Sequence, residues 1–268
     1  MFKKEKHEFA LYVPKLSSII ISSSFHNNEI IINDKDLVHR MMTILRLRPT
    51  QECTFFDKDI NIRCIIKDFL DKKQLLCTIK AKDSNKIFSP HITFLLPVLK
   101  KDDLEAALYS LTEIGVNTIQ LIITQKTQNS CLNQKEIDRL QRIIIAAAEQ
   151  SKNFSYPELK LPINIQEAIK IYESKTRIFF DLNGNSFVSV MQRLHIDCPS
   201  DIVLLVGPEG DLSNEEKELI TSKNFIVCTL TPTVLRSVQT VALSAGFIRS
   251  LFVSILLFLF KIEIEFFC

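Results

Sequence analysis

From residue 92 onward, apolar strand-like runs alternate with segments of helical periodicity, and this alternation constrains the fold more than any other feature. Residues 92–99 form an unbroken apolar run, as expected of a strand that is buried on both faces. Residues 104–114 follow with helical spacing and stop at Gly115, a residue typical of helix C-termini. Further strands are predicted at 118–124, 177–181, 202–206 and 225–230, and a further helix at 136–151. This order predicts an α/β domain with a mostly parallel sheet over residues 86–268.

Residues 1–85 follow a different pattern, in which short strands are separated by turns rich in Asp, Lys and Asn. Strands are predicted at 29–32, 53–56, 62–66 and 75–79, with one helical stretch at 34–45 and a polar link at 80–86. The pattern predicts a compact β-barrel that forms a first domain. These 85 residues hold 15 Lys/Arg against 11 Asp/Glu, and the remainder holds 18 against 20. The basic excess indicates a polyanionic partner, although a chance imbalance of surface charge explains it equally well.

Several common site types are absent from the sequence. With only five Gly, the chain has no GxGxxG fingerprint and no phosphate-binding P-loop, and it also lacks the GxSxG and HExxH motifs. The seven Cys form no CxxC pair and the five His do not cluster with them, so no metal site is expected. The chain begins without an apolar signal segment, and reduced thiols in the cytoplasm are the expectation.

The end of the chain, residues 251–268, is unusually apolar. Residues 251–260 are apolar apart from Ser254, but this run is shorter than the roughly 20 residues that span a bilayer. We expect a buried or dimer-packed helix rather than a membrane anchor.

The most informative segment is residues 202–216, where an apolar strand ends abruptly at Gly207. Pro208 restricts one φ angle, and Gly210 permits a positive φ. Ser213 and Glu216 have the spacing of a capping box, which predicts a helix start. A tight loop at the carboxyl end of a parallel strand can bring main-chain groups close to a ligand, and an ordinary strand-to-helix turn is equally compatible.

Two other segments carry polar groups at suitable places. Residues 229–240 again lead from a strand into a helix, with Arg236 near the helix start, where the helix dipole disfavours a cation. This placement indicates contact with an anionic or electron-rich substrate, and a solvated Arg is the alternative. At residues 145–151, three Ala precede Glu149 and Gln150, which could face a cleft or a dimer contact or simply end an amphipathic helix.

Together these segments resemble the RsmE family of 16S ribosomal RNA uridine-N3 methyltransferases, within the SPOUT superfamily. The loop from Gly207 to Gly210, with Ser213 and Glu216, is similar to that family's GPEGG-(F)S-x-x-E sequence. Further similarities are residues 234–236 to LGxRILRxET, 148–151 to EAxEQSxR, 111–116 to TELGV, 124–127 to TERS, His7 and Phe9 to HRFF, and His39 with 44–46 to H…VLR. The resemblance extends in order from about residue 7 to residue 247.

The resemblance implies a small PUA-like, RNA-docking β-barrel at 1–85. It also implies a SPOUT domain at 86–268 whose parallel sheet is closed by a trefoil knot, a homodimer, and S-adenosyl-L-methionine as cofactor. Arg236 would stabilise charge on the uridine during transfer to N3, and Glu149 is the candidate general base. The residues implied to bind cofactor are Val206, Gly207, Pro208, Glu209, Gly210, Leu230, Thr231 and Leu235. Those implied to bind the rRNA are His7, His39, Arg40, Arg46 and Lys100.

The sequence also departs from the family pattern at three loop positions. Asp211 stands where the second Gly follows the Glu, and Thr231 and Thr233 replace the Gly and the Arg of the LGxR sequence. Thr231 adds a β-branched side chain where the main chain would approach the cofactor. Two alternatives therefore stay open: an rRNA-binding protein of this fold with weak or no catalysis, and a related methyltransferase that acts at another RNA position.

Overall fold

The computed structural model describes residues 8–22, 28–127, 132–173 and 175–266, and the expectation for His7 lies outside them. The chain divides into two compact units. The N-terminal unit comprises residues 1–86 together with 148–155, and the C-terminal unit comprises 87–147 with 156–268. The first unit thus includes a short segment from the middle of the chain that the sequence placed in the second domain.

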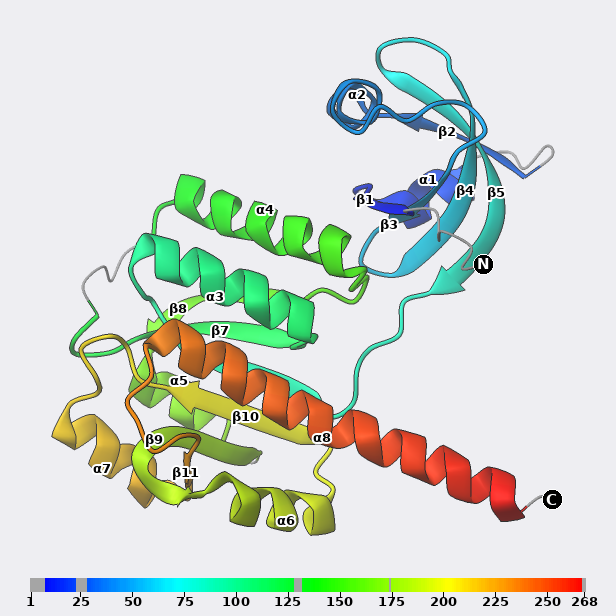
Figure 1. The fold of residues 1–268 in the computed structure, drawn as a ribbon. Coiled ribbons are helices and arrows are strands. Elements are labelled where there is room, and N and C mark those ends of the chain that lie inside the picture. Colours follow the sequence, from blue (N-terminus) through cyan, green and yellow to red (C-terminus); the bar gives the residue numbers. More distant parts are fainter. Residues whose placement is uncertain (1–7, 23–27, 128–131, 174, 267–268) are drawn as a thin grey trace. The chain divides into compact units, whose positions relative to one another are not determined.

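The N-terminal unit is built on one five-stranded sheet with the strand order β1-β3-β4-β5-β2 (Figure 1). β1 pairs with β3 in parallel, and the other neighbours are antiparallel. Its elements are β1 (Phe9–Tyr12), α1 (Leu16–Ser22), β2 (Glu29–Asn33), α2 (Lys35–His39), the π-helix η1 (Arg40–Ile44), β3 (Glu52–Phe56), β4 (Ile60–Phe69) and β5 (Gln74–Ser84). Among the described residues β1 and β2 do not pair with each other, so the sheet stays open and the expected closed barrel is not formed.

The four predicted strands of this unit are present, and the helical stretch at 34–45 is confirmed as α2 and η1, with Asp34 capping α2. The predicted polar link at 80–86 is wrong, because β5 continues to Ser84 and pairs with the start of β4. Lys and Asp alternate with smaller residues there, and ladder hydrogen bonds hold the strand despite its polarity. β1 and α1 were not predicted, since both are short.

The core of the N-terminal unit holds three of the cysteines, Cys53, Cys64 and Cys77, on adjacent strands. Burial raises the pKa of each thiol, so all three are protonated and unreactive at neutral pH. The five cysteines that the structure describes are all free thiols. Cys53, Cys64 and Cys77 act as small apolar residues in the core of the N-terminal unit.

The C-terminal unit contains a six-stranded, fully parallel sheet with the strand order β11-β9-β10-β6-β7-β8 (Figure 1). Its elements are β6 (His91–Pro97), α3 (Lys101–Ile114), β7 (Thr118–Ile123), α4 (Gln134–Ser151), β8 (Glu158–Asn164), α5 (Ile165–Ile171), β9 (Thr176–Ser186), α6 (Phe187–Asp197), β10 (Asp201–Val206), α7 (Asn214–Ser222), β11 (Ile226–Thr229) and α8 (Ser237–Phe266). The parallel α/β architecture predicted from the alternating pattern is therefore confirmed, although β8, α5 and α6 were not predicted.

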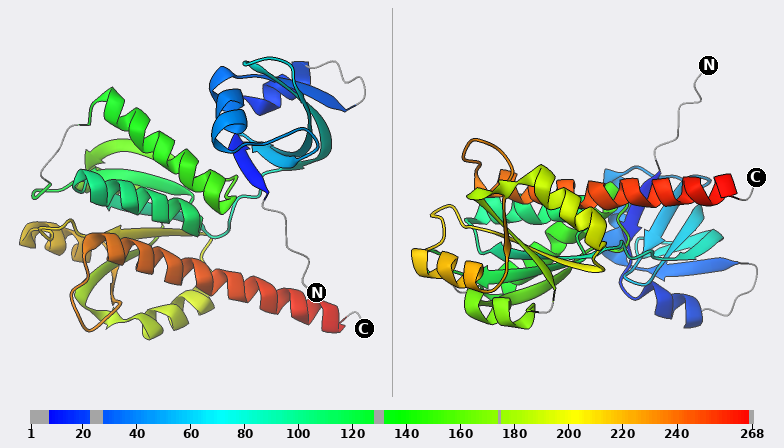
Figure 2. Two further views of the ribbon diagram at one scale, coloured as in Figure 1. Left: turned by 45° about the horizontal axis from the view of Figure 1, so that its top comes forward. Right: turned by 90° about the horizontal axis from the view of Figure 1, so that it is seen from below.

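Both faces of this sheet are covered by helices, which explains the continuous apolar strands. In β10, Ile202 and Leu204 pack into the core shared with α3, α6 and α8, whereas Val203 and Leu205 pack into the core shared with α5 and α7. Successive strand residues point to opposite faces, so both sets must be apolar. Figure 2 shows α3 and α8 side by side over the first of these faces.

The first turns of α8 belong to the core, and the later part of this helix contains the unusually apolar segment that begins at residue 251. Val241, Ala245, Ile248 and Phe252 of α8 are buried in the core that α3 also contributes to. The main chain stays helical to Phe266, while the side chains from residue 253 onward lie outside the described residues, as does the expectation of how that segment packs. Within the residues described, no helix is both long and apolar enough to cross a membrane.

Candidate functional site

A cavity of about 680 Å³ opens at the carboxyl ends of β9, β10 and β11. Its walls come from the loop after β10, the loop between β11 and α8, the end of β9, and the first turn of α3. The lining residues are Asp103, Phe180, Asp181, Leu182, Asn183, Val206, Gly207, Pro208, Glu209, Asp211, Lys217, Cys228, Thr229, Leu230, Thr231, Thr233, Val234, Leu235, Arg236, Ser237 and Thr240. The two loops singled out in the sequence therefore share one cavity, at the edge where parallel sheets bind ligands.

The loop after β10 is tight, and its positive φ lies at Asp211, whose φ is 59°. Gly115 is the only described Gly with a positive φ, so Gly210 does not use the freedom that the sequence offers there. Gly210 also does not line the cavity. At Gly207, an added Cβ would lie 3.3 Å from a carboxylate oxygen of Asp211, so the small residue lets the loop fold back on itself.

The capping box at the start of α7 is confirmed. The Ser213 hydroxyl accepts from the Glu216 main-chain N–H at 3.2 Å, and the Glu216 carboxylate accepts from the Ser213 N–H at 2.9 Å. The second carboxylate oxygen accepts from the main-chain N–H of Gln125, 2.8 Å away in the loop after β7. Glu216 is buried, and these hydrogen bonds stabilise its negative charge and fix the start of α7 beside the cavity.

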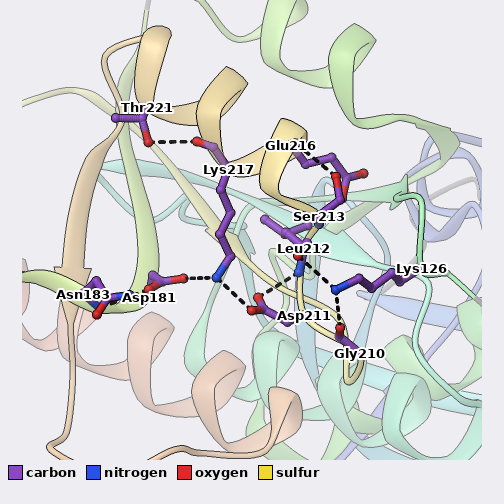
Figure 3. Close-up of polar contacts among 10 residues, drawn as sticks. All are labelled: Lys126, Asp181, Asn183, Gly210, Asp211, Leu212, Ser213, Glu216, Lys217 and Thr221. Carbon is purple, nitrogen blue, oxygen red and sulfur yellow. Dashed lines mark hydrogen bonds and ion pairs between the residues drawn. The ribbon is translucent and has the colours of Figure 1, made fainter.

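Two lysines hold the same loop (Figure 3). Lys126 donates to the carbonyl oxygens of Gly210 and Leu212 at 3.0 and 3.2 Å. Lys217 donates to Asp181 at 2.7 Å and to Asp211 at 2.8 Å. The loop is thus tied to the segment after β7 by one lysine and to the end of β9 by the other.

The ion pairs of Lys217 change the pKa values of the groups involved. Partial burial acts to lower the pKa of the Lys217 ammonium, but its bonds to Asp181 and Asp211 outweigh this effect and raise that pKa. Burial likewise acts to raise the pKa of Asp181, and the bonds from Lys217 and the Asn183 N–H outweigh it and lower that pKa. Asp181 and Lys217 are therefore both charged at neutral pH.

The loop between β11 and α8 is organised by short-range hydrogen bonds. The hydroxyl of Thr231 donates to the carbonyl of Thr233 at 2.8 Å, and the Arg236 N–H donates to the Gln239 side chain at 3.1 Å. Arg236 directly precedes α8, as predicted, and its side chain is exposed at the cavity wall. Among the described residues its guanidinium has no hydrogen-bond or ion-pair partner, which leaves the cation available to a ligand.

The charges on the cavity wall are mainly negative. Asp103, Asp181, Glu209 and Asp211 carry carboxylates, and Lys217 and Arg236 carry the cations. Glu209 accepts a hydrogen bond from the main-chain N–H of Lys100 at 2.9 Å, which joins the loop after β10 to the start of α3. Across the described residues, no group of three His, Cys, Asp or Glu side chains could hold a metal ion.

Gly184 makes a close main-chain approach possible beside the cavity. A Cβ at this position would lie 2.5 Å from the main-chain nitrogen of Cys228, on the neighbouring strand β11. The β9–β11 pairing shifts register between Val227 and Cys228, and Cys228 lines the cavity. Gly184 was not identified from the sequence, because only the pairing of strands far apart in the chain shows the requirement.

Most of the predicted cofactor residues lie on the cavity wall, and Gly210 is the exception. Asp103, Asp181 and Lys217 line the cavity but were missed in the sequence. Asp181 closes a predicted apolar strand, and a search for polar residues at the carboxyl ends of strands would have found it. Lys217 gave no such signal, because a lysine in a helix is ordinarily a solvated surface residue.

Glu149, the candidate base, is held inside the N-terminal unit. Its carboxylate accepts from the Tyr12 main-chain N–H at 2.9 Å and pairs with the Arg40 guanidinium through two hydrogen bonds of 3.0 and 2.5 Å. It is not among the residues that line the cavity. This pairing occupies the carboxylate, and it also occupies Arg40, one of the predicted RNA contacts.

The other predicted RNA contacts that the structure describes are exposed. His39 ends α2 and lies 3.3 Å from the Thr43 hydroxyl, and Arg46 has a positive φ of 53° after η1. Lys100 is exposed immediately before α3, in the C-terminal unit. All three side chains are exposed to solvent.

Comparison with known proteins places these features in a family. The profile of an RNA methyltransferase domain matches residues 88–248. The ribosomal RNA small subunit methyltransferase E of Rickettsia conorii is 28% identical over 234 residues, which cover 86% of this chain and 93% of that protein. The corresponding enzyme 1 of Borreliella burgdorferi is 27% identical over 242 residues, covering 88% of this chain and 98% of that protein.

A solved structure agrees with this result. The crystal structure of a ribosomal RNA small subunit methyltransferase E from Neisseria gonorrhoeae, bound to S-adenosyl methionine, has a TM-score of 0.75 and 25% sequence identity. The match covers 91% of this chain and 98% of that chain. The similarity therefore extends over both units and is not restricted to the parallel sheet.

Proposed function

The chain belongs to the RNA methyltransferase family, as its resemblance to the RsmE proteins predicted. From this premise we propose that it transfers a methyl group from S-adenosyl-L-methionine to N3 of a uridine in 16S rRNA. The observation that carries the proposal is the cavity in which the loops after β10 and β11 meet, with Arg236 free at its wall. We further propose that it acts in the cytoplasm, which is supported by an rRNA substrate.

The residues of the cavity fit this cofactor. S-adenosyl-L-methionine combines a flat adenosine with a cationic sulfonium, and when bound it supplies the electrophilic methyl group. Leu230 and Leu235 offer apolar surface to the base, and Gly207 brings the main chain close to the cavity. The excess of carboxylates on the wall suits a ligand that carries positive charge. The volume lies within the range of ordinary cofactor sites.

Arg236 is the residue that we assign to the reaction. Methylation at N3 requires loss of the N3 proton, and negative charge then spreads to the carbonyl oxygens of the uracil. A guanidinium without another partner can donate hydrogen bonds to one of these oxygens and stabilise the charge as it develops. We do not assign the role of general base to Glu149, because its carboxylate is already hydrogen-bonded to the Arg40 guanidinium and the Tyr12 main-chain N–H. The proton can leave to solvent.

The N-terminal unit is proposed to be a PUA-like module that docks the rRNA. Support comes from its basic excess and from the exposed side chains of His39 and Arg46. Lys100 would contribute from the C-terminal unit. Because such contacts are made to phosphate, binding to the rRNA should weaken as salt rises.

The trefoil knot is also a proposal, supported by the path of the last segments. β11 lies at one edge of the sheet, but α8, which follows it, packs against α3 and β10 nearer the middle. The chain must therefore cross back over β9 after leaving β11. The loops after β10 and β11 line one cavity, as expected where the end of a chain passes through an earlier loop.

A homodimer is proposed from the exposed apolar side chains of the C-terminal unit. Val188 at the start of α6 and Phe247 in α8 are exposed, and the ring of Phe187 packs against that of Phe247 at 4.8 Å. Val234, in the loop that lines the cavity, is 80% exposed. Apolar surface of this kind is commonly covered by a second subunit. Sedimentation at micromolar concentration tests this assignment.

The proposed activity is tested with the purified full chain and small ribosomal subunits from cells that lack the gene. We expect S-adenosyl-L-methionine to bind in calorimetry and one uridine of the 16S rRNA to gain a methyl group, located at N3 by mass spectrometry of nuclease fragments. Binding of rRNA without methyl transfer would identify a non-catalytic member of the fold. Methylation of a different nucleotide would retain the enzyme class and reject the assigned position.

A further inference from the structure

The backbone of Asp211 is left-handed, with a φ of 59°. This region favours Gly and tolerates Asp and Asn better than most other residues. This position corresponds to a Gly in the GPEGG sequence, so this chain carries a side chain where the family pattern has none. The loop at the cavity therefore adopts this conformation without the freedom that Gly would give it.

The Asp211 side chain is fully engaged. One carboxylate oxygen accepts from the Leu212 N–H at 2.8 Å, and the other accepts from the Lys217 ammonium at 2.8 Å (Figure 3). The Asp211 N–H donates to the Pro208 carbonyl at 2.9 Å, which closes the turn. The carboxylate thus stabilises the left-handed turn locally and also connects it to α7.

Lys217 is well placed to hold the Asp211 turn against the end of β9. It follows Glu216, the buried residue of the capping box, so its main chain is fixed. Its ammonium lies between Asp211 and Asp181, and the Asp181 side chain is only 12% exposed. An isolated surface pair contributes little, but an ammonium shared by two carboxylates, one of them mostly buried, is a stronger connection.

We propose that Lys217 is a positioning residue for the methyl donor, because its shared ion pair holds the loop after β10 against the end of β9. This inference rests on the proposed function. Lys217 acts through Asp211 and Asp181, which line the cavity from two separate segments. The ion pair thus holds a left-handed turn at a position where Gly would adopt that backbone without support.

The first test is the K217M variant of the full chain, with K223M as its matched control. Lys223 caps the end of the same helix, pairs with Glu173 at 3.6 Å and does not line the cavity. We expect K217M to raise both the dissociation constant and the KM for S-adenosyl-L-methionine about tenfold, since a misplaced loop contacts the ligand poorly. The kcat at saturating cofactor should change less than about threefold, because a residue that acts through Asp181 and Asp211 to place the loop affects binding more than methyl transfer. K223M should leave all three values as they are.

The second test asks whether the need for Lys217 depends on Asp211. On a D211G background, K217M should weaken cofactor binding clearly less than it does on the wild-type background, because Gly adopts the turn without an anchor. A general loss of stability would give the same loss on both backgrounds. Equal losses, or a K217M variant that binds the cofactor like wild type, overturn the proposal.

If K217M does not fold, the nearly isosteric variants D181N and D211N replace it, and unchanged affinity in both overturns the proposal. A ligand-free measurement separates this inference from the proposed function. Hydrogen exchange of the amides at 210–212 should be faster in K217M than in K223M. If wild type binds no S-adenosyl-L-methionine, the proposed function fails, while this exchange experiment still tests whether Lys217 orders the loop. Equal exchange rates at these amides in K217M and K223M would show that Lys217 does not order the loop.

Discussion

The Arg249 guanidinium donates a hydrogen bond to the main-chain carbonyl of Gly115 at 2.7 Å, and this contact joins α8 to the residue that ends α3. The same side chain also donates to the Pro90 carbonyl at 3.0 Å and lies over the Phe88 ring. Arg249 is buried, and burial lowers its pKa to about 10, so it remains charged at neutral pH. One buried cation thus connects α8 to the end of α3 and to the residue that precedes β6.

Replacing Arg249 should therefore destabilise the C-terminal unit. R249M removes the donors and leaves buried carbonyl oxygens without partners, which we expect to lower the free energy of unfolding by about 2–4 kcal/mol. Urea denaturation measures this loss. R193M is the control, because Arg193 is exposed on α6 and pairs only with Asp197 one turn away, so its loss should stay below about 0.5 kcal/mol. Similar midpoints for the two variants would contradict this role of Arg249.

Gly184 should tolerate no side chain. In G184A the new Cβ would meet the Cys228 main chain, so β9 and β11 must separate, at a cost of about 1–3 kcal/mol or more in unfolding free energy. The matched control is G246A, where no atom lies within 4 Å of the added Cβ and the position is helical. That variant should be more stable by about 0.5–1 kcal/mol. In thermal denaturation, the Tm of G184A should fall below that of the wild type and the Tm of G246A should rise above it. A shift of both Tm values in the same direction would refute the steric explanation.

Arg236 should matter for the reaction more than for the fold. R236A is expected to lower kcat for rRNA methylation by about 100-fold or more, since it removes the donor that stabilises the uracil oxygens. R236K keeps the charge but loses the planar pair of donors, so its kcat should lie between those of R236A and the wild type. Single-turnover methyl transfer to small ribosomal subunits measures both. Full methylation by R236A would exclude the assigned role.

The stability of the N-terminal unit should depend on pH through Asp57. Burial acts to raise the pKa of this carboxyl group, but hydrogen bonds from Ser17, Ile60 and Asp59 outweigh it and hold the pKa below the ordinary 3.8. A lowered pKa in the folded state contributes stability that is present above pH 3.8 and lost as pH falls through the folded pKa.

D57N should therefore be less stable than wild type at neutral pH by about 1–2 kcal/mol, and the difference should shrink below pH 3.8. Denaturant unfolding at several pH values gives the comparison. The control is D59N, whose side chain is exposed, and it should follow wild type at every pH. A gap between D57N and wild type that is constant down to low pH would show that the charge of Asp57 is not involved.

Features with local causes were predictable from the sequence. The capping box of Ser213 and Glu216 depends on residues three apart, and the left-handed Gly115 depends on the helix that it ends. The alternation of apolar and helical segments likewise predicts the parallel sheet, because its strands are buried on both faces. The loops that form the cavity could be located for the same reason, since each follows a predicted strand.

Features that depend on distant pairs could not be predicted. Lys217 meets Asp181 across 36 positions of the chain, and the space for Gly184 is set by the neighbouring strand β11. The open sheet of the N-terminal unit depends on β1 pairing with β3 and not with β2. The positive φ of the loop lies at Asp211 and not at Gly210, and the Asp211 side chain is held there by the Leu212 N–H and by Lys217 from α7.

By itself the amino-acid sequence determined the order of the elements, the helix caps and the two loops that bear the candidate site, because these follow from periodicity and from hydrogen bonds between near neighbours. Only the tertiary structure decided which strands are adjacent, which charges share the cavity and which carboxylates are already paired. Those properties depend on the free energy of packing distant segments together, and the spacing of residues along one chain does not specify it.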